Sequence, residues 1–110
     1  MSEEHEKFIL AIMKIPQNLR EFEATLKNEH PPSHWKPQLQ ALWWDAKGDW
    51  NRAHDCVDSL SGQQASWVHA YLHRKEGDFW NADYWYGRAG KRRPSKPLQE
   101  EFTDLLTQIL

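Results

Sequence analysis

The chain repeats itself: residues 39–57 read LQALWWDAKGDWNRAHDCV, and residues 68–86 read VHAYLHRKEGDFWNADYWY, at a constant offset of 29. Each copy has a Gly-Asp pair near its centre, at residues 48–49 and 77–78. Glycine can end one helix with a positive φ, and aspartate can cap the next helix, so each pair predicts a tight turn. The repeat therefore predicts two stacked helical hairpins.

The two copies also agree in side-chain size. A small residue recurs at Ala41 and Ala70, and a large aromatic residue follows each turn, at Trp50 and Phe79, where we expect it to fill the corner. In this pattern the chain resembles tetratricopeptide-like helical repeat proteins over roughly residues 38–90. The resemblance implies an α-α superhelix that binds partners, although the period is shorter than the usual ~34 residues. The same block also resembles small bacterial proteins of unknown function, and this resemblance gives no information about activity.

Apolar periodicity extends the helical prediction to the whole chain, because no stretch alternates with period two for long enough to indicate a strand. We expect one all-α domain over residues 1–110 with about six to seven helices. Its parts are a degenerate hairpin (2–29), two repeats (38–60 and 67–90) and a C-terminal capping helix (97–110). The third helix begins either after a Ser33 cap or at Pro37. The helices are expected at about 2–15, 18–29, 33 or 37 to 47, 50–60, 63–76, 79–89 and 98–109.

Composition narrows the possible locations and partners. The acidic start MSEEHEK is not typical of a signal peptide, and no apolar run approaches membrane-spanning length. A single cysteine, Cys56, excludes an intrachain disulfide and fits a reducing compartment. We therefore expect a cytoplasmic protein with no membrane partner. The net charge of −2 argues against nucleic-acid binding.

The expected helix 63–76 carries two histidines and a glutamate on one face. His69, His73 and Glu76 follow the spacing His-x-x-x-His-x-x-Glu, in which two imidazoles one turn apart can share a divalent metal and a carboxylate can complete or orient the site. Zinc proteases place glutamate directly after the first histidine, where this chain has Ala70, so that enzyme class is excluded. The alternative is that both rings simply pack against tryptophan.

His54 and Asp83 occupy matching positions of the two repeats. If both side chains face one groove, the histidine lies beside a carboxylate and titrates near neutral pH. The alternative is a single buried hydrogen bond that joins the two hairpins.

The expected helix 79–89 has two different faces. We expect its core stripe to be Phe79, Ala82, Trp85, Tyr86 and Ala89. The opposite face carries two aromatic rings, an amide and a guanidinium, which suit stacking on a ligand or a protein interface. Alternatively, the last helix covers this face. The residues concerned are Trp80, Asn81, Tyr84 and Arg88.

A basic segment follows this helix. Five lysines and arginines lie between residues 88 and 96, with no acidic residue among them. Such a run is solvated, or it contacts a phosphate or an acidic partner.

These observations leave three hypotheses for function. The leading one is a non-catalytic helical-repeat module that binds a protein or small molecule in a groove on the fifth and sixth helices. The second is a His-rich ligand-binding or metal-binding protein or enzyme, and the third is self-association into a homo-oligomer. No phosphate-binding glycine loop, activated nucleophile or cofactor fingerprint is present, so the first hypothesis leads and no cofactor is expected; a divalent metal is the alternative that belongs to the second hypothesis. The second hypothesis places its pocket around His54, His69, His73, Glu76 and Asp83.

Overall fold

The computed structural model describes residues 15–110, and within that range it contains helices and no strand. The expected all-α class is therefore confirmed for these residues, while the expected helix at 2–15 lies outside them, apart from Ile15. No helix of the described part is both long enough and apolar enough to cross a bilayer. The elements are α2 (Leu19–Ala24), the 3-10 helix η1 (Thr25–Lys27), α3 (Pro37–Ala46), α4 (Trp50–Val57), α5 (Gln63–Glu76), α6 (Phe79–Arg88) and α7 (Leu98–Ile109).

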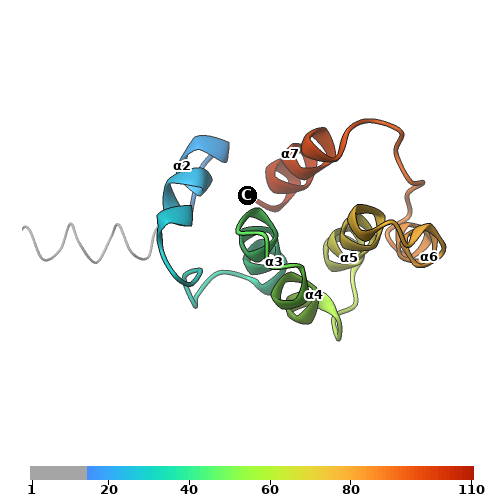
Figure 1. Cartoon of the computed structure of the whole chain (residues 1–110), viewed down its shortest axis with the longest axis horizontal. Helices are drawn as coiled ribbons and strands as arrows, with labels where there is room; N and C mark the ends of the chain where they lie inside the picture. The colour runs from blue at the N-terminus through green and yellow to red at the C-terminus, as the bar shows by residue number, and fades with distance from the viewer. Residues whose placement is uncertain (1–14) are drawn as a thin grey trace, which may run out of the picture.

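Helix α5 lies at the centre of the arrangement. Helices α3 and α4 form one hairpin, α5 and α6 form the next, and α5 also contacts α3, α4 and α7. The chain then arches from α6 to α7, which packs against α5 and reaches α3 and α2 (Figure 1). Because α5 touches four other helices, its polar side chains can bond to groups from several parts of the chain.

Both repeat turns form as the Gly-Asp pairs predict. Gly48 and Gly77 adopt positive φ values of 82° and 85°, a conformation that other residues rarely tolerate. Asp49 then accepts a hydrogen bond from the backbone N–H of Arg52, and Asp78 accepts one from that of Asn81. These caps satisfy N–H groups that the first turn of a helix leaves free.

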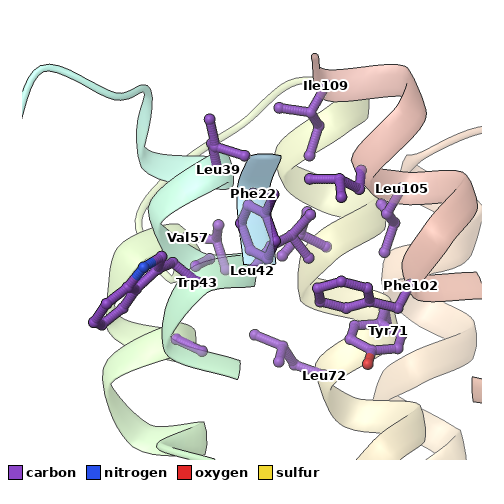
Figure 2. Packing of buried hydrophobic residues seen from close by; sticks show 14 of the residues in the cluster. Phe22, Leu39, Leu42, Trp43, Val57, Tyr71, Leu72, Phe102, Leu105 and Ile109 are labelled. Carbon is purple, nitrogen blue, oxygen red and sulfur yellow. The ribbon is translucent and has the colours of Figure 1, made fainter. Parts of the chain in front are cut away.

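The main apolar core gathers residues from almost every described helix. Figure 2 shows side chains of α3 and of α7 on either side of Phe22, which α2 contributes. Phe22, Leu42, Trp43 and Leu72 are completely buried. Each such side chain stabilises the fold by roughly 1.5–3 kcal/mol relative to exposure.

Several helix ends differ from the sequence prediction. Helix α3 begins at Pro37, which decides between the two predicted starts. The second predicted helix ends with η1 at Lys27 rather than at residue 29. Beyond the helical bonds, the Lys47 ammonium donates to the carbonyls of Leu26 and Asn28. Helix α4 stops at Val57 rather than 60, and the Leu60 N–H instead bonds the Val57 carbonyl in a turn.

A buried carboxylate attaches α7 to the second hairpin. Glu101 is 0% exposed, and its oxygens accept hydrogen bonds from Tyr86 at 2.6 and 2.8 Å, from Trp67 at 3.1 Å and from Arg74 at 2.9 Å. The Arg74 guanidinium supplies the opposite charge that a buried carboxylate requires. This network fixes three helices together, and the sequence pattern did not predict it.

We expect Glu101→Gln to lower the free energy of unfolding by about 3 kcal/mol, because Arg74 would keep a largely buried charge without its counter-charge. Urea denaturation measures the change. The neighbouring Glu100→Gln is the matched control, since Glu100 is exposed, and it should change stability by less than about 0.5 kcal/mol. Equal effects of the two substitutions would contradict the role assigned to Glu101.

Candidate functional site

Three histidines from two helices meet between α4 and α5. His54 of α4 faces His69 and His73, which are one turn apart on α5. The Nε2 atoms of His54 and His69 are 3.0 Å apart, and the ring centroids of His73 lie 5.2 and 4.9 Å from those of His54 and His69. One nitrogen from each ring lies within 4.8 Å of the other two. We call these three residues the histidine cluster.

Aromatic side chains hold the cluster in place. Trp50 lies one turn before His54 and stacks on its ring at 4.9 Å with an interplanar angle of 12°. The indole N–H of Trp50 donates to the Leu72 carbonyl at 2.7 Å, which fixes α4 to α5. On the other side, Trp85 of α6 stacks on His69 at 3.9 Å and 14°. The protein alone therefore orients the rings, through side chains of three helices.

His69 is neutral at physiological pH. Its side chain is buried, and burial lowers its pKa to about 4, helped by the positive charge that His54 and His73 would carry when protonated. The neighbouring Asp58 opposes the shift only weakly. The Nδ1 atom of His69 is buried and has no hydrogen-bond partner within residues 15–110. A neutral imidazole can bind a metal ion through a ring nitrogen, and in His69 the nitrogen that faces His54 is Nε2.

Two carboxylates stand beside the cluster. Glu76 Oε1 lies 2.7 Å from Nδ1 of His73, so this carboxylate fixes the orientation of the ring and leaves Nε2 as the free ligand atom. Asp58 Oδ1 lies 3.9 Å from Nε2 of His54, beyond hydrogen-bond distance, and its side chain is mostly exposed. Glu76 thus acts on His73, and Asp58 stands at the open edge of the cluster.

The donor set of the cluster suits a transition metal. Neutral imidazoles bind Zn²⁺, Cu²⁺, Ni²⁺ and Fe²⁺, and ligand nitrogens about 2.0–2.1 Å from a tetrahedral ion are about 3.3–3.4 Å apart. The 3.0 Å separation of His54 and His69 is close to that value. A second group with suitable spacing, His73, Glu76 and Asp78, is less favourable because the Asp78 carboxylate already accepts hydrogen bonds from Asn81.

The structure places the sequence-predicted His residues together but separates Asp83 from them. His54 joins His69 and His73, whereas the Asp83 carboxylate accepts a hydrogen bond from Arg93 at 2.9 Å on the outer side of α6. The expected pairing of His54 with Asp83 is therefore wrong. Equivalent positions of two hairpins need not face each other, and α4 packs on α5, which supplies His69 in place of Asp83.

The other predicted binding residues lie on the outer face of α6. Trp80 is 82% exposed and Tyr84 is 54% exposed, so α7 does not cover this face. Arg88 donates a hydrogen bond to the Tyr84 hydroxyl, and Asn81 bonds Asp78. None of these four residues belongs to the histidine cluster.

Phe79 departs from its predicted place in the core stripe of α6. It is 48% exposed and lies under the Arg93 guanidinium, 4.3 Å from the ring centroid. The corner of the second turn is therefore not filled in the predicted way.

Three residues beside the cluster, Trp50, Asp58 and Trp85, were not predicted as part of a site. Trp50, His54 and Asp58 follow one another at intervals of four residues, and this spacing could have indicated an aromatic ring, an imidazole and a carboxylate along one face of the fourth helix. Trp85 gave no such signal, because a tryptophan beside core residues is typical of packing.

We expect acidification to destabilise the metal-free protein through His69. The unfolded chain takes up a proton near pH 6.5, whereas folded His69, with its lowered pKa, resists protonation until about pH 4. Above pH 6.5 this difference costs the folded protein nothing. As the pH falls from 6.5 towards 4, the free energy of unfolding decreases by at most about 3 kcal/mol. Urea denaturation in EDTA between pH 7 and 5, above the range of most carboxylates, should show this loss.

The matched variants are His69→Gln and His34→Gln. His69→Gln should flatten the pH dependence, whereas His34→Gln, which changes an exposed loop residue, should keep it. An imidazole of His69 that titrates near pH 6.5 by NMR would contradict the assigned burial.

A comparison of the chain with protein families, curated proteins and solved structures finds no match, so the histidine cluster is interpreted from its own geometry.

Proposed function

We propose that the protein binds one divalent transition-metal ion through His54, His69 and His73. The observation that carries this proposal is the convergence of three imidazoles from two hairpins, with nitrogens within 4.8 Å of one another. The rings also pack against Trp50 and Trp85, as the alternative interpretation of the sequence expected, although none of the three histidines belongs to the apolar core itself. Zn²⁺ is the representative ion, because it prefers nitrogen ligands in tetrahedral geometry.

Each residue has a distinct task in this proposal. In the metal-free protein, one Nε2 of the His54–His69 pair donates a hydrogen bond to the other. The ion would replace this bond and hold α4 to α5 by coordination. Glu76 fixes the His73 ring through Nδ1, in the carboxylate–histidine–metal arrangement that is common at metal sites. Asp58 lies at the exposed edge, 3.9 Å from Nε2 of His54, and a fourth ligand would come from this carboxylate or from water.

Calorimetric titration of purified, EDTA-treated protein with Zn²⁺ tests this proposal. We expect one ion per chain and an increase in unfolding free energy of about 2.7 kcal/mol when free Zn²⁺ is about 100 times the dissociation constant. His54→Ala and His69→Gln should each weaken binding by more than about 100-fold. Glu76→Gln should weaken it by only about 10- to 100-fold, because it acts through His73.

His34→Gln serves as the control for histidines outside the cluster and should leave the affinity unchanged. Circular dichroism must show that each variant is folded before its affinity is compared. If folded His54→Ala kept full Zn²⁺ affinity, this result would contradict metal binding through the histidine cluster.

A second candidate function is that of a tetratricopeptide-like module that binds a protein on the outer face of α6. The observation in its favour is the exposure of Trp80 and Tyr84 beside Arg88, since Trp, Tyr and Arg are enriched at the centres of interfaces. The Arg88 guanidinium lies 5.9 Å from the Tyr84 ring, which adds a cation beside the aromatic surface.

For this candidate we expect Trp80→Ala/Tyr84→Ala to change the unfolding free energy by less than about 1 kcal/mol, because both rings are exposed. The same variant should lose a partner that immobilised wild-type protein retains. Identical sets of proteins retained by wild type and variant would argue against the α6 face.

A further inference from the structure

Two adjoining cavities lie beside the connection between α6 and α7, away from the histidine cluster. The first has a volume of about 640 Å³ and the second about 480 Å³. Both are lined by Tyr86, Lys91, Arg92 and Pro94, so the connecting segment forms a wall that they share. Figure 1 shows this segment arching from α6 to α7. Volumes of this size are typical of sites for small molecules.

The charges that line these cavities do not balance. Three carboxylates are present, and each is paired with one cation: Asp83 with Arg93, Glu101 with Arg74, and Asp104 with Lys96. Two cations, Lys91 and Arg92, have no carboxylate partner within residues 15–110. Both line both cavities, which leaves two uncompensated positive charges at their shared wall.

The two unpaired cations differ in how firmly they are held. The Lys91 ammonium lies over the Trp67 ring, 4.0 Å from its centroid, so its position is fixed by a cation–π contact. The Arg92 guanidinium forms no hydrogen bond, ion pair or ring contact with residues of the described part. A guanidinium presents a planar set of donors that matches phosphate oxygens bidentately.

The first cavity is the better place for an anion with an organic body. Its only carboxylate among the described residues is Asp83, whereas Glu101 and Asp104 line the second cavity. Phe79, nearly half exposed, offers an aromatic surface at the same wall as Arg93. An apolar or aromatic group could therefore contact the part of Phe79 that Arg93 leaves exposed while the anion meets Arg92, with the charge of Lys91 at the wall that the two cavities share.

We infer that the first cavity binds a small-molecule phosphate monoester, whose charge of about −2 matches Lys91 and Arg92. The cavity volume favours a small molecule over a macromolecular partner. This site uses none of the three histidines, so the result of a phosphate-binding test does not depend on whether the metal proposal is correct.

Titration of the full chain with phenyl phosphate, followed by calorimetry and by NMR shifts at low ionic strength in EDTA, tests the inference. We expect saturable one-to-one binding that weakens as salt rises, because salt screens exposed charges. Arg92→Gln should raise the dissociation constant by about tenfold or more, since it removes charge-assisted hydrogen bonds. Phenyl sulfate, with one negative charge, should bind more weakly than phenyl phosphate.

Arg20→Gln is the matched control, because Arg20 is an exposed arginine on α2, which does not line the first cavity. It should leave binding unchanged. Any of three results would overturn the inference: no saturable binding at about 10 mM phenyl phosphate, equal affinity for phenyl sulfate, or equal losses in Arg92→Gln and Arg20→Gln. Arg92 is exposed, so its substitution is expected to leave the fold intact.

Discussion

Three polar side chains of α5 find partners on neighbouring helices, and these partners matter because a buried polar group without one costs about 1–3 kcal/mol. The partners come from three different helices. Tyr71 donates to Asp45 of α3 at 2.9 Å, His69 meets His54 of α4 at 3.0 Å, and Arg74 pairs with Glu101 of α7 at 2.9 Å. These pairings fix where each neighbour sits around α5, and apolar packing then fills the space between them.

His69 differs from the other two, because its partner on the neighbouring helix is another basic ring. Its Nε2 is matched by His54, while its Nδ1 is buried without a partner in the described part of the chain. A core selected only for stability would favour apolar side chains at such positions, since three basic rings that meet without a shared anion are costly when protonated. Coordination of a cation converts this cost into a favourable interaction, because neutral imidazoles then share one ion. The site would thereby couple ion binding to the packing of α4 on α5.

The parts of the fold that depend on local chemistry could be predicted from the sequence. Gly48 and Gly77 with the following aspartates determine the turns, and these turns define the two hairpins. The shared face of His69 and His73 follows from helical periodicity alone. One sequence hypothesis also placed His54 in a pocket with His69 and His73. The direct contact between His54 and His69 depends on how the hairpins stack, and here the repeat was misleading, since it suggested Asp83 as the partner of His54.

Glu101 shows why other features could not be predicted. It stands in the first turn of α7, where glutamate is typical of a solvated helix start, yet it is completely buried. Its burial follows from the approach of Trp67, Arg74 and Tyr86, which lie far from it in sequence. The one local signal was its position four residues before Leu105, on the edge of the apolar stripe. Long-range charge pairing of this kind leaves no periodic signature.

X-ray absorption at the zinc edge of the Zn²⁺-loaded protein would decide whether the histidine cluster is a metal site, because it reports the atoms bound to the ion. We expect three imidazole nitrogens at about 2.0–2.1 Å, with an oxygen ligand as the fourth. His54→Ala should reduce the imidazole count by one, and His34→Gln should leave it unchanged. Coordination by oxygen ligands alone, or a spectrum unaffected by His54→Ala, would contradict the assignment of the ion to the histidine cluster.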